Sequence, residues 1–187
     1  MLLDNFLPDY EFSEVHTITV NASPERVFGA LRELTTADLS PLIYLMLALR
    51  GLPARLLGKR TSMSLTHGPF LERLHKGGFI PLAEEPGREI VFGLVGQFWT
   101  PTGGLEPGIS DAATFLKFDH PAFARAATNL VVCVDERGGT RCTTETRVHA
   151  PEPATRRKLA LYWRIILPGS ALIRMLWLRA IKRKAET

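Results

Sequence analysis

The chain has 187 residues, of which 45% are hydrophobic and 22% are charged, a composition that favours one globular domain over residues 1–187. The net charge of +4 is unevenly spread: residues 154–187 hold nine Lys or Arg against the single acid Glu186 and carry +8, so the rest carries −4. Two cysteines, Cys133 and Cys142, exclude a disulfide framework, and no signal peptide or membrane-spanning run is expected, so we expect a cytoplasmic protein with free thiols.

A strand followed by two helices is predicted at the start of the chain. Residues 14–20 (EVHTITV) alternate between two faces, which predicts a strand. A helix should follow, with Ser23 as its N-cap, Pro24 at its first position and an apolar stripe that reaches Leu34. A second helix is predicted to open at Asp38 or Ser40 and to run through Pro41 to about Leu49.

This second helix is expected to end before Gly51 and Pro53, because proline lacks the amide hydrogen that a helix interior needs. Residues 55–63 follow no clear pattern. Residues 68–76 suit a short helix closed by the glycine pair 77–78.

Two hairpins are predicted after this point. The first joins strands at 79–83 and 88–99, and Gly93 and Gly96 within its second strand suggest a bulge or bend. The second joins strands at 123–134 and 140–149.

Between the hairpins, residues 100–110 form a loop-like segment with three glycines and two prolines. Asp111 should then cap a short helical turn that carries Phe115 and Phe118, and Pro121 should end this turn.

Residues 154–187 are predicted to form one long amphipathic helix, kinked at Pro168–Gly169. Its apolar stripe recurs at three- and four-residue steps through Leu159, Trp163, Ile166, Ser170, Ile173, Trp177 and Ile181. The arginines are expected to fall mostly off this stripe and to reach water: Arg156, Arg157, Arg164, Arg174, Arg179 and Arg183.

The order of these elements predicts an α+β domain, in which a strongly curled antiparallel sheet wraps around the long terminal helix. A space between the sheet and that helix is then the default ligand site.

Three passages resemble the START/Bet v 1-like superfamily, also called SRPBCC or helix-grip, which includes polyketide cyclases and lipid-transfer proteins. ITVNASPERVFGAL at 18–31 resembles the first strand and helix. TETRV at 144–148 and YWRIILPGSALIRMLWLRAIKRKAE at 162–186 resemble the last strand and the terminal helix of a bacterial branch. The resemblance implies a helix-grip fold over residues 1–187. It does not decide the activity, because this scaffold holds binding proteins, enzymes and co-chaperones.

Glu145 and Arg147 are the sharpest candidate pair, since residues two apart on a strand share a face. With an even number of residues in the preceding loop, the pair shares the face of Leu130 and looks into the apolar interior. With an odd number, Cys142 faces inward and the pair is solvated. The pair is therefore a structural buried pair, a surface pair, or a ligand contact or acid/base element.

The predicted ligand-binding set combines this pair with aromatic wall candidates: Trp99, Glu145, Arg147, Phe92, Phe98, Phe118, Tyr162 and Trp163. Each aromatic residue, Phe115 included, also suits plain core. Trp99 is the best single candidate, because it ends a strand beside the loop 100–110, where a lid over a cavity mouth would lie.

No metal or cofactor site is expected. His67 and His75 are eight residues apart, and the other histidines, His16, His120 and His149, are isolated. No glycine-rich nucleotide fingerprint or phosphate loop is present. Nucleic-acid binding is not expected either, because Trp163 and Trp177 of the basic helix lie on its apolar stripe.

We expect a non-enzymatic protein that binds a small hydrophobic molecule, lipid-like or polycyclic, with Glu145 and Arg147 satisfying its polar end. One alternative is a polyketide cyclase-like or hydrolytic enzyme that uses Glu145 or a histidine as general base. Another is an interaction module whose basic C-terminal helix docks on an anionic membrane or an acidic partner. Both a monomer and a homodimer remain open.

Overall fold

The computed structural model describes residues 1–56, 58, 68–102, 104–136 and 138–187; most of the patternless stretch 55–63 lies outside them. The elements run along the chain as η1 (Leu2–Asn5), β1 (Phe12–Val20), α1 (Pro24–Arg32), η2 (Thr36–Asp38), α2 (Pro41–Leu56), α3 (Phe70–Lys76), β2 (Ile80–Glu85), β3 (Glu89–Gly96), α4 (Ala112–Lys117), β4 (Ala124–Val134), β5 (Thr140–His149) and α5 (Pro153–Glu186).

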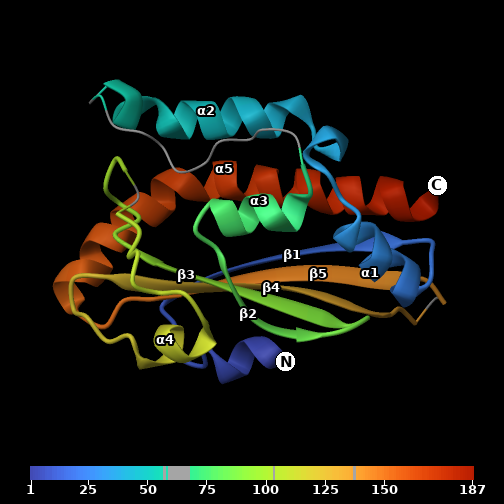
Figure 1. Ribbon diagram of the computed structural model, residues 1–187, viewed down its shortest axis with the longest axis horizontal. Coiled ribbons are helices and arrows are strands. Elements are labelled where there is room, and N and C mark those ends of the chain that lie inside the picture. The colour runs from blue at the N-terminus through green and yellow to red at the C-terminus, as the bar shows by residue number, and fades with distance from the viewer. Residues whose placement is uncertain (57, 59–67, 103, 137) are drawn as a thin grey trace.

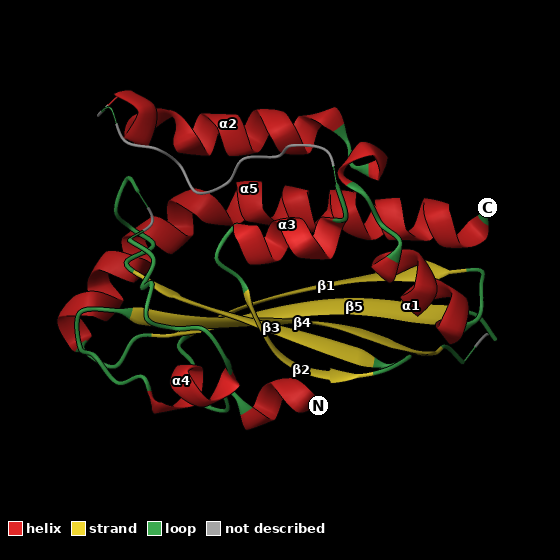
Figure 2. Cartoon of the chain, viewed as in Figure 1, coloured by secondary structure: helices red, strands yellow, loops and turns green. Residues whose placement is uncertain are grey.

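The five strands form one antiparallel sheet in the order β1-β5-β4-β3-β2. Helices α2, α3 and α5 lie over one face of this sheet, whereas η1 and α4 lie under the other (Figures 1 and 2). The chain therefore has the expected α+β helix-grip fold, a sheet gripped against one long C-terminal helix.

Helix α5 is continuous over 34 residues although Pro168 lies inside it. Its first part, orange in Figure 1, runs obliquely to the rest. The predicted apolar stripe is confirmed, because Leu159 and Ile181 are fully buried and Ile173 and Trp177 pack on the main core.

Local signals explain most element starts. The Ser23 side chain caps α1 by accepting a hydrogen bond from the Arg26 amide. Asp111 caps α4 through the Thr114 amide at 2.8 Å. Helix α3 ends at Gly77, as expected.

Two local predictions are wrong. Helix α2 does not end before Gly51 but continues to Leu56. Pro53 has no amide hydrogen to donate to the carbonyl of Leu49, but Leu49 is exposed, so this carbonyl can bond to water. The bulge of the first hairpin lies in β2, between Pro81 and Ala83, and not at the glycines of β3.

The loop between β4 and β5 has five residues, 135–139, because Val134 pairs with Thr140. Val132 consequently pairs with Cys142, and both face the main core beside α1 and α5. This odd count turns Glu145 and Arg147 to the opposite face of the sheet.

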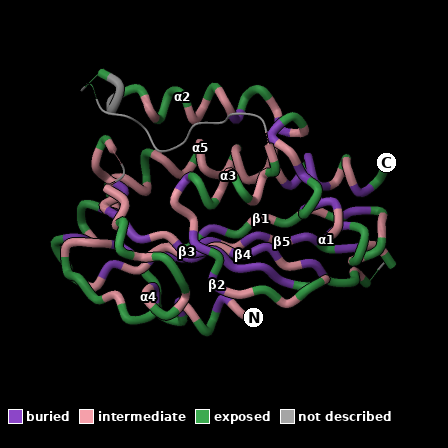
Figure 3. The backbone as a smooth tube through the Cα atoms, in the orientation of Figure 1, coloured by how far each residue is buried: buried purple, intermediate pink, exposed green. Residues whose placement is uncertain are grey.

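That opposite face is also covered. Leu3 and Leu7 from the N-terminal segment and Phe115 from α4 form a second buried cluster beneath β2 and β3. Figure 3 shows the buried backbone concentrated in the sheet between these two covers, while α2 carries mostly exposed and intermediate positions.

Candidate functional site

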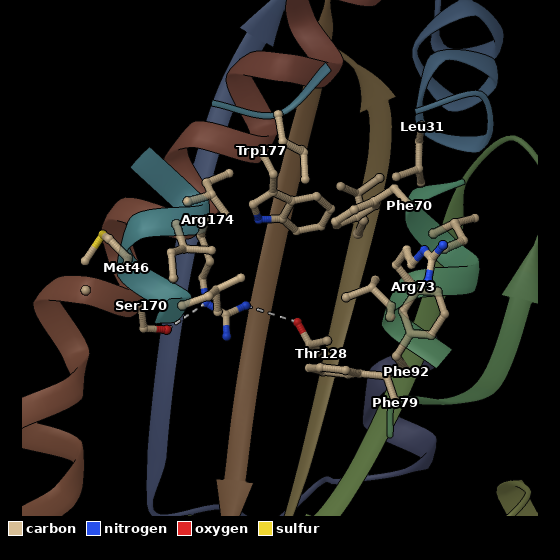
Figure 4. Close-up of a pocket in the computed structure, with 18 of the residues that line it drawn as sticks. Leu31, Met46, Phe70, Arg73, Phe79, Phe92, Thr128, Ser170, Arg174 and Trp177 are labelled. Atoms are coloured by element: carbon tan, nitrogen blue, oxygen red, sulfur yellow. Dashed lines mark hydrogen bonds between the residues drawn. The ribbon is translucent and has the colours of Figure 1, made fainter. Parts of the chain in front are cut away.

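A cavity of about 200 Å³ lies between the sheet and the helices that cover it. Its apolar walls come from four directions: Ile43, Met46 and Leu47 of α2, Phe70, Leu71 and Leu74 of α3, Ile90, Phe92 and Leu130 of β3 and β4, and Ile166, Ile173 and Trp177 of α5. Figure 4 shows Trp177, Phe70 and Phe92 pointing into this space. Such walls suit an apolar molecule.

The cavity wall also carries three cations, Arg50 of α2, Arg73 of α3 and Arg174 of α5. Arg174 is the one that reaches the sheet through Thr128. Its guanidinium Nε donates to Ser170 Oγ at 3.3 Å, and Nη1 donates to Thr128 Oγ1 at 3.3 Å (Figure 4). The same Nε lies 3.3 Å from Oε2 of Glu14 on β1. Burial lowers the pKa of Arg174, and the Glu14 carboxylate opposes this shift. No described residue bonds its second terminal nitrogen, Nη2, which leaves a donor available.

The polar cluster continues along β1. Glu14 accepts a hydrogen bond from Ser170 Oγ at 3.1 Å, and its other carboxylate oxygen lies 2.6 Å from Nε2 of His16. The Glu14 side chain is only 5% exposed. Its inward direction follows from the alternation of β1, in which Val15 and Thr17 point outward.

Glu145 and Arg147 do not reach this cavity, because the sheet lies between them and it. Arg147 Nε lies 2.7 Å from Glu145 Oε1, and its Nη1 donates to Asp4 at 2.8 Å and to the Leu7 carbonyl at 3.2 Å. The Arg147 guanidinium also lies 4.7 Å from the Tyr10 ring centroid. The expectation that an odd loop leaves the pair solvated is therefore wrong, because the N-terminal segment covers it.

Of the predicted aromatic wall residues, Phe92 lines the cavity. Phe98, Trp99, Tyr162 and Trp163 gather instead in a third cluster, around Leu159. Phe118 packs near Phe115 beneath the sheet. No described residue of the loop 100–110 lines the cavity; Leu105 of this loop pairs with Gly96 at the end of β3.

The sequence did not single out the α2 and α3 wall residues or Arg174. Arg174 was expected to reach water, yet it follows Ser170 by four residues and Ile173 by one, so it borders the apolar stripe. Glu14 lies 160 residues earlier, and nothing local signals that the two side chains meet.

No protein-family model matches this chain, and no curated protein does either. Among solved structures it is similar to DR_A0006 from Deinococcus radiodurans, with 13% identity over 85% of this chain and 99% of the other and a TM-score of 0.32. It is also similar to the hypothetical protein jhp0584 from Helicobacter pylori, with 9% identity over 97% and 93% and a TM-score of 0.42. Ara h 8.0201 has 12% identity over 93% and 97% and a TM-score of 0.29.

The five-stranded antiparallel sheet and the 34-residue C-terminal helix of this chain themselves agree with the expected helix-grip fold. Similarity at these identities and TM-scores gives no basis for a function, so the function is argued from the cavity itself.

Proposed function

We propose that this protein binds a small, largely apolar molecule in the cavity between the sheet and helices α2, α3 and α5. The observation that carries this proposal is the set of apolar walls from five elements, α2, α3, β3, β4 and α5, around about 200 Å³ of space. Burial of apolar ligand surface contributes about 25 cal/mol per Å². We place this function in the cytoplasm, in keeping with the two free thiols.

The polar end of the ligand is assigned to Arg174 rather than to Glu145 and Arg147. Arg174 has a donor without a partner among the described residues, while Glu14 beside it offsets its charge. An anionic ligand group would lie close to the Glu14 carboxylate, which disfavours it. A neutral oxygen acceptor, such as a hydroxyl or carbonyl group, suits this position best.

The first experiment is native mass spectrometry of freshly purified protein, followed by denaturing extraction. We expect a retained small molecule in the parent protein, none in Ile173→Trp, which fills the cavity, and the parent result in Ile165→Trp, which adds the same bulk on the exposed side of α5. Circular dichroism establishes that both variants fold.

A fluorescent fatty alcohol supplies the second measurement, because a weakly held ligand is lost during purification. Its affinity should fall about tenfold or more in Ile173→Trp and stay unchanged in Ile165→Trp. Equal affinity in all three proteins would remove the cavity as the binding site.

A second candidate function is a cyclase-like or hydrolytic enzyme. It is favoured by the contact of 2.6 Å between His16 and Glu14, next to the polar end of the cavity, because a carboxylate orients and activates a histidine base. Hydrolysis of p-nitrophenyl esters should then be lost in His16→Gln and retained in His120→Gln. A rate no higher than that of buffer alone would exclude this hydrolytic activity.

A further inference from the structure

Exposed apolar side chains gather on two helices. Among the described residues, thirteen large apolar side chains are exposed, and eight of them lie on α2 and α5. Those on α2 follow each other at steps of three and four residues and are called here the leucine row: Leu42, Leu45, Leu49, Leu52 and Leu56. Side chains at this spacing share one helix face. Ile43 and Leu47 line the cavity from the opposite face, so the leucine row points away from the protein interior.

Exposed apolar residues of α5 continue this surface. Leu161 and Ile165 are 65% and 73% exposed. Helix α2 lies directly against α5, because the methyl group of Met46 lies 3.1 Å from the position a Cβ atom would take at Gly169. Figures 1 and 3 show α2 on the outside of the molecule, with exposed positions along its length. Apolar side chains that gather in this way, unlike single exposed apolar residues, indicate an interaction site.

The charged residues on the two helices that carry this surface are positive, apart from Glu186 at the far end of α5. Residues 41–56 and 153–185 contain no Asp or Glu. Exposed Arg157 and Arg164 lie one turn to either side of Leu161 along α5, and exposed Lys158 lies one turn before it. Arg50 of α2 is exposed as well, although it also lines the cavity from the opposite face of this helix. An apolar strip flanked by these cations is complementary to an anionic lipid surface.

We propose that the leucine row of α2, together with Leu161 and Ile165 of α5, docks the protein onto an anionic lipid bilayer. Both helices would lie in the plane of the membrane surface, with leucines among the acyl chains and Arg and Lys at the phosphates. A second copy of this chain fits less well, because a two-fold contact would set these cations against each other.

Docking in the plane of the surface also agrees with the surroundings of α5. By length and composition α5 is apolar enough to cross a membrane. Its cavity side, however, holds the Arg174–Glu14 ion pair and packs on the sheet, which a spanning helix would lose. The proposal stands independently of the cavity ligand.

Co-sedimentation with vesicles tests the proposal. The parent protein should sediment with vesicles of equal parts phosphatidylcholine and phosphatidylglycerol, and much less with phosphatidylcholine alone or at high salt. The double variant Leu45→Glu/Leu49→Glu should lose this binding by about tenfold or more. Leu116→Glu is the matched control, because Leu116 is an exposed leucine of α4, beneath the opposite face of the sheet, and it should bind as the parent does.

Charge is tested separately. Arg157→Gln/Lys158→Gln should weaken vesicle binding roughly five-fold for each cation removed, while Arg26→Gln on α1 should leave it unchanged.

Equal sedimentation of the parent and Leu45→Glu/Leu49→Glu would overturn the proposal. A parent dimer, measured by light scattering, that becomes monomeric in that variant and binds no vesicles would assign the surface to a second copy instead. Ile173→Trp should keep vesicle binding, which separates this proposal from that of the cavity ligand.

Discussion

Arg174 of α5 lies against Glu14 of β1, with 3.3 Å between Nε and Oε2, so the long helix and the edge strand of the sheet are joined by an ion pair beside the cavity. The Glu14 side chain is almost fully buried; Ser170 Oγ donates to the same oxygen, Oε2, and His16 Nε2 lies 2.6 Å from the other oxygen, Oε1. The pair therefore fixes the helix on the sheet and at the same time holds a donor at the cavity wall.

Removing only one member of this pair should be costly. Arg174→Met leaves the Glu14 carboxylate without its cation in a largely buried place, and we expect the free energy of unfolding to fall by about 3 kcal/mol. Glu14→Gln/Arg174→Met should recover most of this loss, because both charges are then absent. Urea denaturation of the two single variants and the double variant measures the coupling. If the losses of free energy in the two single variants add up to the loss in the double variant, Glu14 and Arg174 do not stabilise each other, which would contradict this prediction.

Arg147 should matter for stability and not for ligand binding. It holds Glu145, Asp4 and the Leu7 carbonyl on the face of the sheet away from the cavity. Arg147→Met should lower the free energy of unfolding by about 2–4 kcal/mol and leave the affinity for a fluorescent fatty alcohol unchanged. Arg88→Met, which removes an exposed partner of Glu85, is the matched control and should change stability by less than about 0.5 kcal/mol. A selective loss of affinity in Arg147→Met would return this residue to the ligand site.

Two glycine-to-alanine changes should have opposite signs. A Cβ atom at Gly93 of β3 would lie 2.8 Å from Leu82 and 2.9 Å from the fully buried Phe115 ring, so Gly93→Ala should destabilise the protein by about 1–3 kcal/mol. Gly29 of α1 has no atom within 4 Å of that position, and Gly29→Ala should stabilise by about 0.5–1 kcal/mol through helix propensity. Thermal unfolding of both variants gives the two signs. A stabilised Gly93→Ala protein would show that this close approach is absent.

The two thiols should differ strongly in reactivity. Burial raises the pKa of Cys142 to about 12 from a usual value of 9.0, and Cys133, an exposed residue of β4, contributes in the same direction. At a pH three units below its raised pKa, only about one Cys142 thiol in a thousand is ionised. Only this thiolate form reacts. In native protein at mildly alkaline pH, iodoacetamide should therefore label Cys133 alone. Adding denaturant should expose Cys142 to labelling, and labelling of both thiols without it would contradict its burial.

Much of the fold could be predicted from residue patterns that extend over a few positions of the sequence. The spacing of Leu159, Ile173 and Ile181 placed the apolar stripe of α5 correctly, because a helix repeats every 3.6 residues whatever it packs against. Ser23 and Asp111 marked helix starts through bonds within one turn.

Less of the candidate site could be predicted from the sequence. Glu145 and Arg147 were correctly paired, yet their role depended on the register of one hairpin and on a distant segment, residues 1–10, that covers them. Trp99 was placed at a cavity mouth by its neighbouring loop, whereas the structure places it in a cluster around Leu159.

Local sequence patterns were enough to predict that these strands and helices exist, the amphipathic stripe of α5 and the basic charge at its end, because these depend on neighbours within a few residues. Only the tertiary structure decided which face of the sheet meets the helices, that Arg174 meets Glu14, and that the leucine row of α2 stays outside. These relationships join residues far apart in the chain. Packing fixes them, and no local spacing encodes them.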